Sequence, residues 1–93
     1  MFAVSLSFSD IRDEKMPTVL RHQGYRFYFY SHEPNEPAHI HVDWGEKSAK
    51  FWLSPVALAR NIGYNARELS ELLRVVIAHQ QKFKEAWHEH FDQ

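Results

Sequence analysis

The strict alternation of apolar and polar residues from Ala38 to Trp44 is the feature that most limits how this chain can fold. The apolar positions are Ala38, Ile40, Val42 and Trp44, and the polar positions between them are His39, His41 and Asp43. A period of two is typical of a β-strand with one buried face, and residues two apart share a face with their Cα atoms about 6.5–7 Å apart. The pattern therefore predicts a strand whose two imidazoles point the same way, away from the core and into solvent.

A proline-containing segment precedes this strand. Pro34 and Pro37 are excluded from a helix interior and from a central strand, so residues 32–37 are expected to form a rigid loop. The loop would carry His32, Glu33 and Glu36 to the mouth of the histidine-bearing strand. We therefore expect imidazoles and carboxylates to cluster here, at the place where any chemistry of this chain would occur.

Three further segments have strand patterns. Residues 18–22 end at Gln23-Gly24, a hairpin turn signal, and residues 48–53 follow a turn that begins with Gly45. Residues 25–30 are dense in aromatic side chains and lack a helical period, which favours a central strand. Tyr25, Phe27 and Phe29 would share one face of it, and Arg26, Tyr28 and Tyr30 the other. Residues 18–53 are thus predicted to form an antiparallel sheet of about four strands.

The remainder of the chain is predicted to be helical. Ser54-Pro55 resembles a helix start, with serine as the N-cap, and Gly63 would end this short helix. Asn65 and Glu68 have the spacing of a capping box. Apolar residues then recur at steps of three and four up to Trp87, with an interruption at Gln80, which predicts one long C-terminal helix lying on the sheet. The predicted class is α+β.

Size and composition limit the possible functions. The 93 residues correspond to one domain, which we place at 16–93, and residues 1–15 are interpreted as an N-terminal extension because Met16-Pro17 resembles a second start. Residues 1–8 alternate like a possible additional strand. The chain has no cysteine, no apolar run of membrane-spanning length and no secretion signal, so we expect a cytoplasmic protein. The net charge of −1 argues against binding nucleic acid by bulk electrostatics.

Several segments resemble a bacterial family called domain of unknown function 4160. They are residues 16–21 (MPTVLR), 24–31 (GYRFYFYS), 36–42 (EPAHIHV), 49–53 (AKFWL), 58–61 (LARN) and the helical segment from Glu68 to Trp87. The resemblance covers everything except about the first fifteen residues. It implies a small protein encoded beside another small protein, of the 2442 family of unknown function, in an arrangement similar to toxin–antitoxin pairs. It implies no catalytic residues.

The residue types of the predicted cluster suit metal-free cleavage of RNA. Histidine can serve as the base for the 2′-hydroxyl and as the acid for the leaving oxygen, a cation can stabilise the phosphorane, and exposed tyrosines can stack on bases. The catalytic candidates are His39, His41, Glu36 and Lys50, and the substrate-binding candidates are Arg26, Tyr28, Tyr30, His32 and Arg60. Arg60 could instead pair with Glu68. The basic and acidic side chains of residues 16–93 balance at nine each, which weighs against this interpretation.

Two alternatives stay open. His39 and His41 could bind Zn²⁺ or another divalent metal ion together with His32 and a nearby carboxylate, which is Glu33, Glu36, Asp43 or Glu46. The first interpretation needs no cofactor. The histidines could instead only support the proline-containing loop, and the exposed aromatic side chains could then form a non-catalytic surface for a neighbouring protein or a second copy of this chain. The expected partners are thus a small cognate protein, RNA or a homodimer, and not a membrane.

Overall fold

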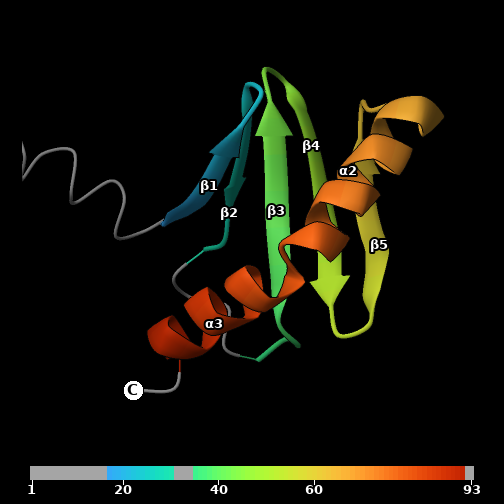
Figure 1. Cartoon of the computed structure of the whole chain (residues 1–93). Helices are drawn as coiled ribbons and strands as arrows, with labels where there is room; N and C mark the ends of the chain where they lie inside the picture. Colours follow the sequence, from blue (N-terminus) through green and yellow to red (C-terminus); the bar gives the residue numbers. More distant parts are fainter. Residues whose placement is uncertain (1–16, 31–34, 92–93) are drawn as a thin grey trace, which may run out of the picture.

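The computed structural model describes residues 17–30 and 35–91, which fold into one five-stranded antiparallel sheet and two helices (Figure 1). The strands are β1 (Thr18–His22), β2 (Tyr25–Tyr28), β3 (His39–Trp44), β4 (Lys47–Leu53) and β5 (Val56–Ile62), and the helices are α2 (Ala66–Ala78) and α3 (Gln80–Phe91). The strands pair in their sequence order. The predicted α+β class is confirmed. The predicted extension 1–15 and the strand pattern at 1–8 lie outside the described residues.

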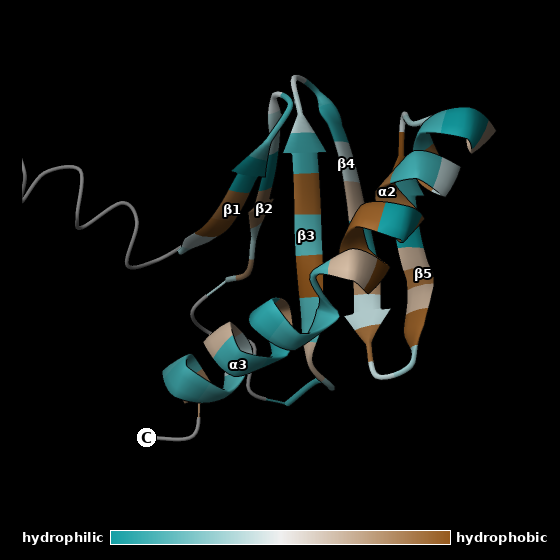
Figure 2. Cartoon of the chain, viewed as in Figure 1, coloured by the Kyte–Doolittle hydropathy of each residue, from teal (hydrophilic) through white to brown (hydrophobic). Residues whose placement is uncertain are grey.

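Both helices lie on the same face of the sheet, as Figures 1 and 2 show. Phe27, Ile40, Val42 and Phe51 point to this face and are at most 1 % exposed. Helix α3 contributes Phe83, whose ring stacks on that of Phe27 with 5.5 Å between the centroids. The core thus lies between one face of the sheet and the helices, as the period-two and helical patterns predict. We call the other side of the sheet the outer face, and no helix of residues 17–30 and 35–91 forms a layer on it.

The predicted short helix at residues 54–62 is wrong, because this segment is the edge strand β5. It pairs with β4 from Leu53 opposite Val56 to Ser48 opposite Ile62, with one irregularity in the register next to Lys50. The serine and proline that resembled a helix start form the tight β4–β5 turn. The sheet therefore has five strands rather than about four. The hydrogen bonds that β5 makes with the otherwise unpaired edge of β4 outweigh the local helix-start signal.

The predicted long helix is divided at His79 into α2 and α3. The backbone N–H of His79 still donates to the Val75 carbonyl at 3.0 Å, but its ψ of 17° departs from the helical value. The Gln80 side chain, which interrupts the apolar stripe, donates to the Leu53 carbonyl at 2.6 Å. This bond connects the helix junction to the end of β4, so the interruption in the sequence pattern coincides with a change in helix direction (Figure 1).

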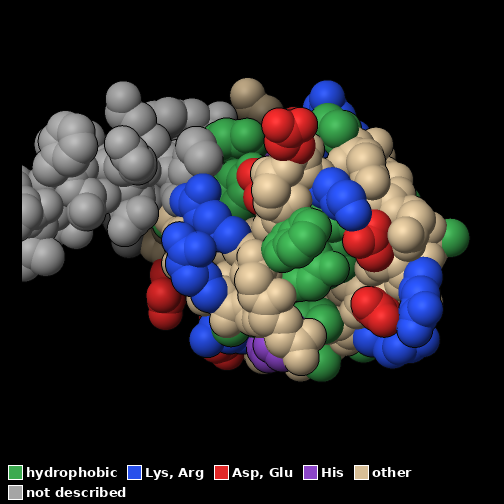
Figure 3. All heavy atoms as spheres, turned by 90° about the horizontal axis from the view of Figure 1, so that it is seen from above, with side chains coloured by type: hydrophobic (Ala, Val, Ile, Leu, Met, Phe, Trp, Pro, Cys, Tyr) green, Lys and Arg blue, Asp and Glu red, His purple; other side chains and the backbone are tan. Residues whose placement is uncertain are grey.

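One end of the sheet carries the β1–β2 and β3–β4 turns, and Figure 3 looks onto this end. Gln23 and Gly24 both have positive φ, as the type I′ turn of a two-residue hairpin requires. A Cβ on Gly24 would lie 2.8 Å from the indole nitrogen of Trp44, so a larger residue would displace this ring. Trp44 is 47 % exposed, whereas Ile40 and Val42 of the same alternating segment are fully buried. Lys47 lies over its ring at 5.4 Å from the centroid.

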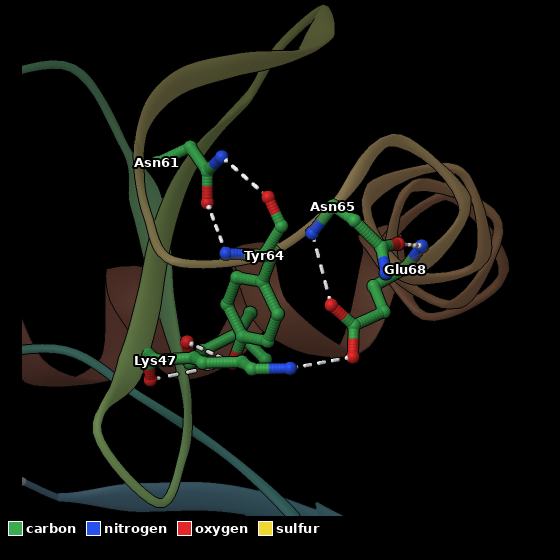
Figure 4. Close-up of polar contacts among 6 residues, drawn as sticks. Lys47, Asn61, Tyr64, Asn65 and Glu68 are labelled. Carbon is green, nitrogen blue, oxygen red and sulfur yellow. Dashed lines mark hydrogen bonds and ion pairs between the residues drawn. The ribbon is translucent and has the colours of Figure 1, made fainter.

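A group of polar contacts holds the connection between β5 and α2 in place (Figure 4). The Asn61 amide donates to the Tyr64 carbonyl at 2.9 Å and accepts from the Tyr64 N–H at 3.1 Å. The buried Tyr64 side chain in turn donates its hydroxyl proton to the Val42 carbonyl at 2.9 Å. These bonds fix the chain between β5 and α2 against the central strand β3.

The predicted capping box is confirmed at the start of α2. Asn65 accepts from the backbone N–H of Glu68 at 2.8 Å, and the Glu68 carboxylate accepts from that of Asn65 at 2.9 Å. The same carboxylate accepts from the Lys47 ammonium at 2.8 Å (Figure 4). The Lys47 bond and then the Asn65 backbone bond lower the pKa of Glu68. Glu68 therefore pairs with Lys47 and not with Arg60, the pairing that the sequence left open.

We predict that replacing Glu68 by glutamine lowers the melting temperature at pH 7 and that this loss disappears in acid. Glutamine preserves the capping box but removes the charge that Lys47 stabilises. Because folding lowers the pKa of Glu68, its contribution is present above the ordinary carboxyl value of 4.5 and is lost as the pH falls through the folded value. Thermal unfolding of both proteins between pH 7 and pH 3 measures this.

Glu71 supplies a matched control, since this exposed residue of α2 lies 3.9 Å from Arg67 in a solvated pair. Glu71→Gln should leave the melting temperature nearly unchanged across the same pH range. An equal loss for Glu68→Gln at pH 7 and pH 3 would contradict the assigned electrostatic origin.

Candidate functional site

The candidate site lies on the outer face, where β2 to β5 place four side chains side by side. Tyr28 pairs with His41, His41 with Lys50, and Lys50 with Arg60, so the row crosses four strands. Directly opposite residues of antiparallel strands have their side chains on the same face. The pairing therefore brings together the imidazole of His41 and the cations of Lys50 and Arg60, which come from three different strands.

A hollow of about 290 Å³ opens over this row. Its walls include Glu36, His41, Lys50, Arg60 and Tyr30, all of which the sequence had indicated. Lys50 forms an ion pair with Glu36 from the preceding loop. The exposed guanidinium of Arg60 makes no hydrogen bond or ion pair within residues 17–30 and 35–91, so its charge is available to a ligand. The hollow thus combines a carboxylate, an imidazole and two cations.

His39 does not reach the hollow. Its ring lies 5.0 Å from that of His41, so the prediction that both imidazoles share a side of the strand holds. However, His39 is 0 % exposed, which corrects the expectation that solvent reaches both rings. Its Nδ1 donates to the Pro37 carbonyl at 2.8 Å, and its ring centroid lies 4.7 Å from that of Trp87 on α3. The helix covers the beginning of β3, where His39 stands, and leaves His41 partly exposed.

Tyr28 is also buried, at 2 % exposure, and offers no free ring face for a base. Its ring stacks on that of His41 at 5.3 Å, and the Tyr28 hydroxyl donates to Asp43 at 2.9 Å. The second Asp43 oxygen accepts from Ser48 at 2.7 Å. Burial, followed by hydrogen bonds with Tyr30 and Asp43, raises the pKa of Tyr28 well above its ordinary value. Tyr28 thus stays a neutral structural support beneath His41.

The remaining substrate-binding candidates are divided. Tyr30 is 38 % exposed at the rim of the hollow, with its ring 4.8 Å from that of His41. Arg26 lies away from the hollow, where its Nε donates to Thr18 at 2.7 Å and its guanidinium covers the Tyr28 ring. His32 and Glu33 lie outside the described residues. Of the candidates that the structure describes, it therefore brings together Glu36, Tyr30, His41, Lys50 and Arg60.

Three lining residues were missed in the sequence: Ser48, Ala49 and Ile62. Ser48 precedes Lys50 by two positions on β4, so the alternation of that strand already placed its side chain beside Lys50. Ile62 lines the hollow from β5, and it could not be found while residues 54–62 were interpreted as a helix. Residues 17–30 and 35–91 contain no group of three or more histidine, aspartate or glutamate side chains arranged to hold a metal ion.

The comparisons with known proteins identify a family. A model of the family described as domain of unknown function (DUF4160) matches residues 24–88, most of the chain, and the protein belongs to this family. No curated protein and no solved structure matches the chain significantly. In the part of the chain that the structure describes, neither helix is long and apolar enough to cross a membrane.

The two histidines of β3 should differ in what they contribute to stability. We predict that His39→Ala lowers the free energy of unfolding by at least about 2 kcal/mol, because it leaves a cavity against Trp87 and removes the bond to Pro37. His41→Ala should cost clearly less, since His41 is partly exposed. Urea unfolding followed by tryptophan fluorescence measures both. Equal losses would contradict a structural role specific to His39.

Proposed function

We propose that the outer face binds single-stranded RNA, with one phosphate of the strand held in the hollow. The observation that carries the proposal is the placement of the Arg60 guanidinium, which has no partner in the described parts of the chain. It lies opposite Lys50 and lines the same hollow as His41. Two cations that face one hollow attract an anion of phosphate size. The exposed ring of Tyr30 at the rim provides a surface on which a base can stack.

The charge balance of the chain fits a local mode of binding. Residues 16–93 carry equal numbers of basic and acidic side chains, so attraction of a polyanion to the whole surface is weak. A site that holds one phosphate releases few counterions, and its affinity for single-stranded RNA should fall only modestly with salt, with a logarithmic slope of about −0.7. Single strands are favoured over duplexes because only unpaired bases can stack on Tyr30.

The same hollow has the groups for cleavage by transphosphorylation. In this proposal the Glu36 carboxylate takes the proton of the ribose 2′-hydroxyl, and the 2′-oxygen attacks the phosphorus. The bond from phosphorus to the 5′-oxygen breaks, and a protonated His41 gives its proton to this leaving oxygen. The products are a 2′,3′-cyclic phosphate and a free 5′-hydroxyl. Lys50 and Arg60 stabilise the extra negative charge of the phosphorane. Glu36 replaces His39 as the base because His39 is buried.

The genetic side of the proposal rests on the family resemblance. We propose that the protein is the toxin-like component of a bacterial toxin–antitoxin-type pair in the cytoplasm, and that the small protein encoded beside it covers the outer face.

A non-catalytic interaction module is the competing function, and the exposed aromatic ring of Trp44 favours it. The two functions differ in one respect, because only the first needs RNA.

For binding, we predict that Arg60→Gln weakens the affinity for a labelled single-stranded RNA and makes its salt slope less steep by about 0.7, the value for one phosphate contact. Fluorescence anisotropy between 25 and 200 mM salt measures both quantities. Arg74→Gln removes the same charge from an exposed position on α2, on the other side of the sheet, and should change neither. If the two variants behave alike, the hollow is not the RNA site.

For cleavage, we predict that Glu36→Gln and His41→Asn each lower the rate at least about 100-fold while RNA binding persists, since each removes one proton-transfer group. The rate is measured on a labelled RNA in the presence of a chelator, and a 2′-deoxy substitution at the scissile nucleotide should block it. Adding the protein encoded by the adjacent gene should inhibit cleavage. Intact RNA with the wild-type protein, together with unchanged affinity for the neighbour in both variants, would instead support the interaction module.

A further inference from the structure

A second pocket lies on the outer face next to the hollow. It has a volume of about 280 Å³, and its walls are mainly apolar: Pro37, Ala38, Trp52, Ser54, Pro55 and Ala57. Trp52 follows Lys50 by two residues on β4, so both side chains are on the same side of the sheet. The Lys50 ammonium, which contributes to the hollow, lies 4.6 Å from the centroid of the Trp52 ring. A residue of the hollow, Lys50, therefore contacts a residue of the second pocket, Trp52.

We propose that this second pocket binds the base of the nucleotide whose phosphate lies between Lys50 and Arg60. This inference rests on the proposed function and adds to it the place where the strand's base is held. Two prolines and a tryptophan provide flat, rigid, apolar walls suited to a planar ring. The hydroxyl of Ser54, which makes no hydrogen bond within the described part of the chain, adds a polar group for the edge of the base.

The position of Lys50 distinguishes a nucleotide from an apolar peptide side chain. A pocket for an apolar side chain gains nothing from a cation against its tryptophan, because such a ligand has no charge to complement Lys50. A nucleotide has a planar apolar ring and an anionic phosphate joined by a short sugar, which matches an aromatic pocket joined to a cationic hollow. Trp52 is held in place for this role, since the buried His39 ring contacts it edge-on at 5.8 Å.

The test compares two labelled strands with the same number of phosphates, an eight-nucleotide uridine RNA and an abasic ribose-phosphate strand of equal length. The wild-type protein should bind the uridine strand at least about 25-fold more tightly, because the abasic strand lacks both the base in the pocket and the base on Tyr30, each contributing at least about 5-fold. Trp52→Leu should lower this preference at least about 5-fold, the share of one stacked base, and leave the affinity for the abasic strand unchanged, whereas Trp52→Phe should lower the preference less. Trp44→Leu, at the other end of the sheet, should keep the full preference.

The outcomes separate this inference from the proposed function. If Arg60→Gln weakens RNA binding but Trp52→Leu keeps the full preference for bases, the base pocket is wrong and the phosphate hollow stands. If Trp52→Leu lowers the affinity for both strands equally, Trp52 stabilises the fold or the position of Lys50 and does not contact a base. If Trp52→Leu does not fold, the test uses Trp52→Phe instead. A Trp52→Phe protein that prefers the uridine strand as strongly as the wild type does, despite its smaller ring, would overturn the base pocket. If the wild-type protein binds neither strand, both proposals fail.

Discussion

The period of two along β3 is the constraint on which the rest of the molecule depends. It places Ile40 and Val42 beneath the helices, where both are fully buried, and it places His41 on the opposite side of the sheet. A shift of the register by one residue would reverse every side chain and put the imidazole into the core. The hydrophobic effect that holds the helices on one face therefore also decides which polar groups appear together on the other. The candidate site is in this sense a product of the same packing that stabilises the fold.

The sequence predicted the elements whose patterns are local and strong. The alternation of β3 and β4, the turn at Gln23-Gly24 and the capping box at Asn65 depend on neighbours in the chain. The segment 54–62 was misassigned because its partner decides its conformation: the edge of β4 offers hydrogen bonds that no local pattern reveals. Gln80 was recognised as an interruption, but its bond to the Leu53 carbonyl is a tertiary contact between residues 27 positions apart.

The same distinction explains how much of the candidate site could be predicted. Alternation alone indicated that His41 and Lys50 lie away from the core, and both line the hollow. Burial of His39 could not be read from alternation, because it arises where the Trp87 ring of α3 passes the beginning of β3. Arg60 reaches the hollow only because β5 exists. Residue types were thus visible in the sequence, whereas their exposure and their grouping required the order of strands and the path of the last helix.

Separate roles for His39 and His41 follow from their surroundings. His39 satisfies the Pro37 carbonyl and fixes the loop that carries Glu36, so it controls where the carboxylate meets Lys50. The His41 ring stacks on the Tyr28 ring. The Tyr28 hydroxyl donates to Asp43 and stays neutral, so the residue that supports the His41 ring is uncharged. One histidine therefore positions the loop, and the other presents a titratable group to the hollow. The fold needs this division of roles, because residues 17–30 and 35–91 provide no second layer on this side of the sheet to position the loop that carries Glu36.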